Sequence, residues 1–167
     1  MGGSGGRRYI REKDLSALAR MARENIREAV QPTRRNVFIS FAREDLQVVN
    51  ALRGQAKNEM SNLEFSDRSL PEPFNSKDAE YIKRGIRDRI KQSSVTLCFL
   101  SEDSSRSDWV NWEIEESLKL GKGVVAMYQG DKPPQTLPQA VKNNDIKIVQ
   151  WNQGEITNAI DEAAKER

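Results

Sequence analysis

The chain has 167 residues, which is enough for one ordinary domain with a substantial core and an additional segment. Its 27 basic and 25 acidic residues nearly cancel, so the overall charge gives no reason to expect a nucleic acid or an anionic membrane as a partner. The chain has no histidine, which removes the usual general base and the commonest metal ligand, so any catalysis must rely on carboxylates and we predict no metal site.

The N-terminal region differs in charge from the rest of the chain. Residues 1–35 contain nine basic and four acidic residues, whereas residues 36–167 contain 18 and 21. We interpret residues 1–11 as a flexible basic N-terminus and residues 12–35 as an amphipathic helix and linker. Apolar residues recur every three or four positions between Leu15 and Ala29, and Pro32 ends the pattern. The helix either packs on its own domain, which we favour, or mediates assembly with another protein.

The chain shows no signal for export or membrane insertion. No run approaches the roughly 18 apolar residues of a membrane span, and the start lacks the apolar core of a signal peptide. The single cysteine, Cys98, lies in a predicted strand and cannot form an internal disulfide, which fits a reducing compartment. We therefore expect a cytoplasmic protein.

Strands and helices are predicted to alternate from residue 36 onward. Short runs with apolar residues, most of them rich in β-branched or aromatic side chains, predict strands at 36–41, 63–67, 95–100, 124–128 and 146–150. Apolar residues at helical spacing predict helices at 46–57, 78–91 and 155–165, with a further helix starting near Asp108. We predict an α/β, flavodoxin-like three-layer sandwich with a five-stranded parallel sheet in the order 2-1-3-4-5. Ligands bind such sheets beyond the carboxyl ends of strands 1 and 3.

The start of the helix near Asp108 is the most informative part of the chain for function. Ser107 and Asp108 are helix-capping candidates after a predicted buried strand and a polar loop. Trp109 and Glu113 are four residues apart and share one helical face, about 100° from the apolar stripe that contains Val110. An aromatic ring and a carboxylate at the border of the core can face a cleft.

Several motifs occur in an order that matches a known family. They are Val37-Phe-Ile-Ser-Phe41, a proline-containing loop after the second strand, Ser94-Val-Thr-Leu-Cys-Phe-Leu100, Asp108-Trp-Val-Asn-Trp-Glu-Ile-Glu115 and Gly121-Lys-Gly123. Together they resemble a TIR domain and, more narrowly, the TIR-like proteins of bacterial Thoeris antiphage defence systems. The resemblance covers about residues 36–151, and we assign residues 36–167 to a TIR-like domain.

The resemblance implies that the protein consumes NAD⁺. Catalytic TIR domains break the bond between nicotinamide and ribose with the glutamate that corresponds to Glu113. Thoeris-type members make a cyclic or modified ADP-ribose signal that activates a partner effector. NAD⁺ is then a substrate, and we expect no bound cofactor. The chemistry gives a separate reason for a carboxylate, because loss of neutral nicotinamide leaves positive charge on the ribose. The structural alternative is that Glu113 is a solvated helix carboxylate.

Other residues are candidates for substrate binding, each with an ordinary structural alternative. Trp109 could wall the ribose or stack on a base, or it could belong to the core. Phe41 and Arg43 follow the first strand, where family members line the nucleotide cleft, and Arg43 could bind pyrophosphate or simply lie on the surface. The last four lie in or near the loop that would shape the mouth of the site, which could equally be an ordinary polar loop: Asp67, Asn75, Ser76 and Lys77.

Two other functions are compatible with the same motifs. The domain could be a catalytically silent TIR-like module that builds assemblies through its proline-containing loop and N-terminal helix. It could also be a nucleoside deoxyribosyltransferase-like enzyme, which would use a helix carboxylate on nucleosides rather than on dinucleotides. We expect self-association, because a cleft lined by side chains would hold NAD⁺ weakly unless neighbouring subunits complete it.

Overall fold

The computed structural model describes residues 11–30, 35–59, 63–66 and 73–166, with the backbone alone for residues 26–30 and 59. The chain divides into two compact units, Met1–Thr33 and Arg34–Arg167. In the first unit, α1 (Glu12–Val30) is the predicted amphipathic helix, and carboxylates in its first turn interact favourably with the helix dipole. None of the helices in these described ranges is both long and apolar enough to cross a lipid bilayer.

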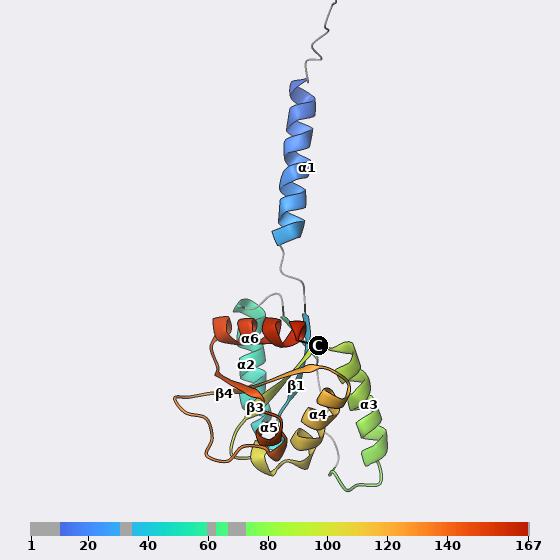
Figure 1. Cartoon of the computed structure of the whole chain (residues 1–167), viewed down its shortest axis with the longest axis vertical. Coiled ribbons are helices and arrows are strands. Elements are labelled where there is room, and N and C mark those ends of the chain that lie inside the picture. The colour runs from blue at the N-terminus through green and yellow to red at the C-terminus, as the bar shows by residue number, and fades with distance from the viewer. Residues whose placement is uncertain (1–10, 31–34, 60–62, 67–72, 167) are drawn as a thin grey trace, which may run out of the picture. The chain divides into compact units, whose positions relative to one another are not determined.

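The second unit is built on a five-stranded parallel sheet with helices on both faces (Figure 1). The strand order β2-β1-β3-β4-β5 confirms the predicted fold. The strands are β1 (Arg35–Ser40), β2 (Leu63–Ser66), β3 (Val95–Leu100), β4 (Gly123–Tyr128) and β5 (Lys147–Gln150). The helices and 3₁₀ turns are η1 (Arg43–Asp45), α2 (Leu46–Glu59), α3 (Ala79–Gln92), η2 (Ser104–Arg106), α4 (Asp108–Lys119), α5 (Gln139–Asn143) and α6 (Gln153–Lys165).

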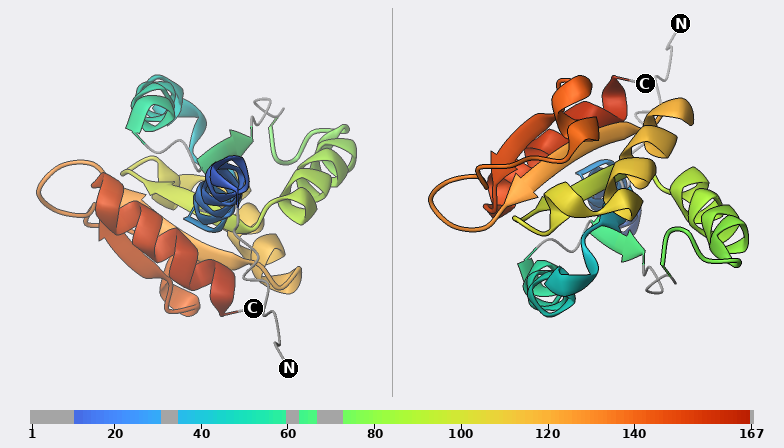
Figure 2. Two further views of the ribbon diagram at one scale, coloured as in Figure 1. Left: turned by 90° about the horizontal axis from the view of Figure 1, so that it is seen from above. Right: turned by 90° about the horizontal axis from the view of Figure 1, so that it is seen from below.

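Among the described α-helices, α5 is the one that the sequence pattern does not predict, and the 3₁₀ turns η1 and η2 are not predicted either. Helix α5 has five residues and begins after Pro138, so it is too short to display a helical repeat of apolar residues. The other strand and helix boundaries lie within two residues of the predicted ones. Figure 2 shows the arrangement of the helices around the sheet in two further views.

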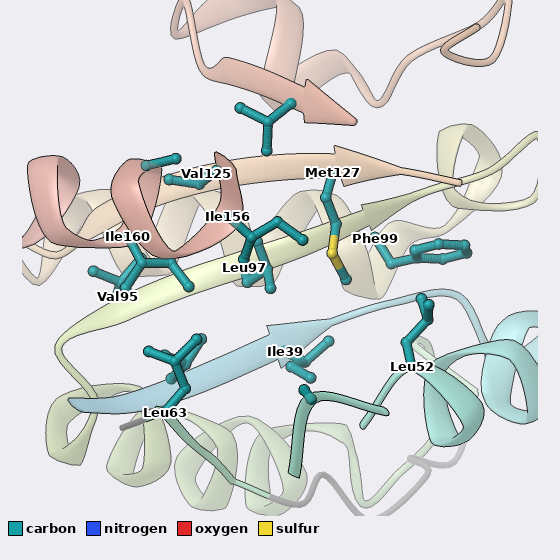
Figure 3. Packing of buried hydrophobic residues seen from close by; sticks show 14 of the residues in the cluster. Ile39, Leu52, Leu63, Val95, Leu97, Phe99, Val125, Met127, Ile156 and Ile160 are labelled. Carbon is teal, nitrogen blue, oxygen red and sulfur yellow. The ribbon is translucent and has the colours of Figure 1, made fainter. Parts of the chain in front are cut away.

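Side chains of the strands alternate between the two faces of the sheet, as the two-residue repeat of a strand requires. In β1, Val37 and Ile39 join the large hydrophobic cluster that α2 and α6 cover, whereas Phe38 packs with α3 and α4 on the other face. Figure 3 shows the large cluster, in which Ile156 and Ile160 of α6 pack with side chains of β3. The alternation therefore determines which residues of β1 can reach α4.

The chain leaves β1 and β3 toward opposite faces of the sheet. Helix α2, which follows β1, packs on the face shared with α6, whereas α4, which follows β3, packs on the face shared with α3 and α5. The carboxyl ends of β1 and β3 are paired neighbours, with Ser40 opposite Cys98. This end of the sheet is its topological switch point, the place where open α/β sheets bind ligands.

The turn between α4 and β4 accounts for two glycines. Gly121 has a φ of 70°, in the left-handed region that often ends a helix, and its N–H bonds back to the carbonyl of Leu118 at 3.0 Å. A Cβ on Gly123 would lie 2.3 Å from the backbone oxygen of Ala163 in α6. The Gly-Lys-Gly turn thus ends α4 and lets β4 approach α6 closely.

Candidate functional site

The first two turns of α4 place two predicted site residues inside the protein. Ser107 caps the helix by accepting a hydrogen bond from the N–H of Val110 at 3.2 Å. Trp109 is 7% exposed and Glu113 is 0% exposed. Trp109 and Glu113, which were predicted to lie at the border of the apolar stripe, are therefore buried. The reason is that α3 and the turn before it pack against this side of α4.

A hydroxyl group from β1 holds the carboxylate of Glu113. Ser40, the last residue of β1, donates a hydrogen bond from Oγ to Oε2 of Glu113 at 2.5 Å, and both residues are fully buried. Burying a carboxylate is costly unless it is hydrogen-bonded, so Ser40 offsets part of that cost and orients the group. The hydrogen bond joins β1 directly to α4 at the switch point.

Two further buried hydroxyl groups continue the polar layer between the sheet and α4. Ser117 donates a hydrogen bond to the backbone oxygen of Glu113 at 2.7 Å. The hydroxyl oxygens of Ser117 and Thr96 lie 2.7 Å apart, and Thr96 belongs to β3. These bonds fix α4 over β3, which keeps Glu113 within reach of Ser40.

A second carboxylate, which the sequence analysis does not include, lies at the same end of the sheet. Asp45, at the end of η1, is 8% exposed, and its Oδ2 accepts a hydrogen bond from the hydroxyl of Ser101, the first residue after β3. Burial raises the pKa of Asp45 above its ordinary value, the bond from Ser101 lowers it, and the charges of Asp103 and Glu44 raise it further, with a net increase. The polar residues that follow both β1 and β3 in the sequence are the signal that could have identified Asp45 and Ser101.

The connection between β3 and α4 is also fixed from the side of α5. Oε1 of Glu102 accepts a hydrogen bond from the backbone N–H of Gln135 at 3.1 Å. Oδ1 of Asn111, in the first turn of α4, accepts one from the backbone N–H of Ala140 at 2.9 Å. The N-terminal half of α4 is therefore held by side chains on two sides.

Carboxylates and hydroxyl groups are the buried polar side chains at the switch point. Within the described ranges, no group of three or more His, Cys, Asp or Glu side chains is placed to hold a metal ion. A carboxylate that a hydroxyl group orients can stabilise a developing positive charge or bind the hydroxyl groups of a sugar. The arrangement suits chemistry at a glycosidic carbon.

Trp109 lies in an aromatic cluster between α3 and α4. Its ring meets Phe74 edge-on, with centroids 4.9 Å apart, and meets Trp112 in the same way at 5.9 Å. The Nζ of Lys83 lies 4.4 Å from the centroid of Phe74 and 5.6 Å from that of Trp112. These contacts give Trp109 a packing role, and its contact with a ribose or a base stays a prediction.

The two predicted site residues that follow β1 have different surroundings. Phe41 is fully buried in the cluster that α2 and α6 cover, on the face of the sheet opposite to Glu113. Arg43 is exposed at the start of η1. The structure therefore places Phe41 in the core, and the contact of either residue with NAD⁺ stays a prediction.

The predicted residues of the loop after β2 lie before α3. Ser76 is half-buried and accepts a backbone hydrogen bond from Ala79 at 3.2 Å. Asn75 and Lys77 are exposed. Asp67 lies outside the described residues. The role of these four residues at the mouth of the site stays a prediction.

A cavity of about 450 Å³ lies at the opposite end of the sheet. The turn between α4 and β4, the start of β5 and α6 line this open cavity, and Lys147 and Glu162 are among its lining residues. Their exposed ion pair, 2.8 Å long, is a surface feature. Parallel sheets bind ligands at the carboxyl ends of their strands, so we place the candidate site around Glu113 rather than in this cavity.

Two solved structures show similar architecture. One is the TIR domain of the Toll-related receptor TRR-2 from Hydra magnipapillata, with 16% sequence identity, a TM-score of 0.49, and coverage of 75% of this chain and 91% of that chain. The other is the CMP N-glycosidase BcmB of Clostridium botulinum, with 14% identity, a TM-score of 0.46, and coverage of 75% and 98%. At these values, the activity of neither protein bears on this chain.

The chain is 28% identical over 124 residues to a protein of Cytobacillus dafuensis named "Putative cyclic ADP-D-ribose synthase TIR2". The match includes 71% of this chain and 32% of that protein, so this chain spans about a third of the relative's length. The model of the family described as "Thoeris protein ThsB, TIR-like domain" matches residues 38–133, more than half of the chain. The chain therefore belongs to the family of Thoeris ThsB proteins with a TIR-like domain.

Proposed function

We propose that this protein cleaves the bond between nicotinamide and ribose in NAD⁺, with Glu113 as the catalytic carboxylate. We further propose that it converts the ADP-ribose part into a cyclic or modified signal that activates an effector. Family membership supports the substrate, and the name of the relative from Cytobacillus dafuensis supports the cyclic product. The observation that carries the proposal is the buried Glu113, oriented by Ser40 at the carboxyl end of β1.

The proposed reaction needs a negative charge beside the ribose. When the bond between C1′ and the nicotinamide nitrogen breaks, both electrons leave with nicotinamide, which becomes neutral, and the ribose acquires oxocarbenium character. An ionised Glu113 stabilises this charge, and the effect is stronger in a site that excludes water. Attack by water on C1′ then gives ADP-ribose and a proton. Attack by a ribose hydroxyl, which also releases its proton, or by an adenine nitrogen gives a cyclic product.

The proposal includes a conformational step. Glu113 is 0% exposed, so NAD⁺ can reach its carboxylate after the side chains around it move. The aromatic cluster of Trp109 and Phe74 packs on the same side of α4. Substrate-driven movements of this kind commonly complete an active site and exclude water from it.

The test is to incubate the purified full chain with NAD⁺ and to follow nicotinamide and adenosine-containing products by chromatography with mass detection. Glu113→Gln keeps the size and one acceptor oxygen but removes the charge, and we expect the rate to fall at least about a hundredfold. Glu115→Gln is the matched control, because Glu115 is an exposed carboxylate on the same helix. Equal activity of the Glu113→Gln variant and the wild type would refute the role of Glu113.

The same assay separates the two other functions. A catalytically silent assembly module would release no nicotinamide even at high protein concentration. A deoxyribosyltransferase-like enzyme would act on nucleosides, and nucleosides would compete with NAD⁺ for it. We propose NAD⁺ cleavage over both, because it unites the buried carboxylate with the family match.

Self-association is the accompanying proposal. A weakly held dinucleotide gains affinity if a neighbouring subunit completes its site. Sedimentation velocity and specific activity should both depend on protein concentration over the same range. A monomer at all concentrations, with activity strictly linear in protein, would contradict it.

A further inference from the structure

We propose that Asp45 is a positioning residue for the substrate site, and that it acts through Ser101 to hold the connection between β3 and α4. The inference rests on the proposed function of Glu113 and names a residue pair that this function needs. Asp45 lies in the connection that follows β1, and Ser101 is the first residue after β3. These two connections run to opposite faces of the sheet, so the hydrogen bond between the two side chains crosses the switch point.

Ser101 is itself the anchor of a tight turn. Its Oγ accepts a hydrogen bond from the N–H of Ser104 at 3.1 Å, and its own N–H donates to Oγ of Ser104 at 2.9 Å. The hydroxyl of Ser104, a fully buried residue, donates in turn to the backbone oxygen of Ser101 at 2.8 Å. A group that fixes the Ser101 side chain therefore fixes the whole turn, and Asp45 is such a group.

The turn leads directly into the helix that carries Glu113. The 3₁₀ turn η2 follows it, and Ser107 then caps α4. Glu113 reaches back to Ser40, five residues before Asp45 in the chain. Two side-chain hydrogen bonds thus join the segment 40–45 to the segment 101–113, one inside the protein and one at its rim. Removing the hydrogen bond between Asp45 and Ser101 therefore makes the segment that positions Glu113 toward its substrate less rigid.

The burial of Asp45 separates a positioning role from a purely structural one. Because burial raises its pKa, the ionised form of Asp45 is less favourable in the folded protein than in the unfolded chain. Asparagine has the same size and can still accept a hydrogen bond from Ser101, without a buried charge. Asp45→Asn should therefore be at least as stable as the wild type and, because it keeps the hydrogen bond from Ser101, should retain most of the activity that Asp45→Ala loses.

The experiment compares kcat, KM and thermal unfolding of full-chain variants with NAD⁺ as substrate. We expect Asp45→Ala and Ser101→Ala each to lower kcat/KM about tenfold. Because both remove the same hydrogen bond, kcat/KM of the double variant should equal that of the less active single variant. Ser101→Thr, which keeps the hydroxyl, should recover most of the activity. Glu44→Gln, which changes the exposed neighbouring carboxylate, is the control and should behave as the wild type.

Hydrogen–deuterium exchange gives a readout that does not depend on activity. Peptides from residues 101–107 should exchange faster in both alanine variants than in the wild type. If Glu113→Gln is inactive while the Asp45 and Ser101 variants retain wild-type kcat/KM and exchange, the positioning role is overturned and the proposed function stands. If the wild type itself does not cleave NAD⁺, the proposed function fails and the substrate-site role of Asp45 fails with it.

Discussion

Charged groups are buried at one end of the parallel sheet and exposed at the other. At the carboxyl ends of β1 and β3, Glu113 is fully buried and Asp45 nearly so, and each accepts a hydrogen bond from a serine hydroxyl. At the amino ends of β4 and β5 there is a cavity of about 450 Å³, yet the ion pair of Lys147 and Glu162 beside it is exposed. The cavity and the buried carboxylates therefore lie at different ends of the sheet, and the proposed site is the end with the buried carboxylates.

The largest effect expected from this comparison follows from removing the hydroxyl that holds Glu113. Ser40→Ala leaves a buried carboxylate without that donor, which should lower the free energy of unfolding by about 1–3 kcal/mol. It should also lower kcat for NAD⁺ by about tenfold to a hundredfold, because the carboxylate loses its fixed orientation. Ser40→Thr keeps the donor and serves as the control. Unchanged kcat in a folded Ser40→Ala variant would show that orientation by Ser40 does not matter.

A backbone contact at the other end of the sheet should affect stability alone. Gly123→Ala places a Cβ 2.3 Å from the backbone oxygen of Ala163, so β4 and α6 must move apart. We expect a loss of about 2 kcal/mol in urea unfolding, with little change in the KM of the folded protein for NAD⁺. Gly54→Ala is the matched control, because a Cβ there meets nothing within 4 Å. A large rise in KM would mean that the amino ends of the strands contribute to the site.

The pH dependence of stability should reveal the buried Asp45. Its pKa is raised in the folded protein, so its contribution to stability is full below the unfolded value near 3.8 and is lost as the pH rises through the folded value. Asp45→Asn does not titrate. The stability of this variant relative to the wild type should therefore increase from about pH 4 upward and then level off. Urea unfolding of both proteins between pH 4 and 7 measures this, and a relative stability that falls with pH would contradict it.

The smallest effect is expected at the exposed ion pair. Glu162 raises the pKa of Lys147, and Lys147 lowers that of Glu162, but solvent screens the interaction because both side chains are more than half exposed. Lys147→Met should leave the melting temperature and the rate of NAD⁺ cleavage near the wild-type values, at low and at high salt. A clear loss of activity would move the site toward the cavity at the amino ends.

The fold was predictable from the sequence because its signals are local. Short apolar runs indicate the strands, and the four-residue spacing of residues such as Val110 and Ile114 indicates the longer helices. The alternation of strands and helices implies the parallel sheet. Glu113 could also be proposed as a site residue from its spacing from Trp109 and its position after β3, and the structure shows that it is buried. The five-residue α5 offered too short a pattern.

The partners of the site residues were not predictable, because they depend on approach in three dimensions. Asp45 and Ser101 are 56 residues apart in sequence, and Ser40 and Glu113 are 73 apart. The enclosure of Trp109 depends on Phe74, which comes from a turn whose path no periodic pattern describes. The spacing of Glu113 could thus be read from the sequence, whereas its hydrogen-bond partner Ser40 could be identified only from the structure.

The most direct test of the central claim is the rate of nicotinamide release from NAD⁺ by the full chain, measured for the wild type, Glu113→Gln and Glu115→Gln side by side at several protein concentrations. The account predicts release by the wild type and by the Glu115→Gln variant, with a rate at least about a hundredfold lower for Glu113→Gln. Release at equal rates by all three proteins, or by none of them at any concentration, would contradict it.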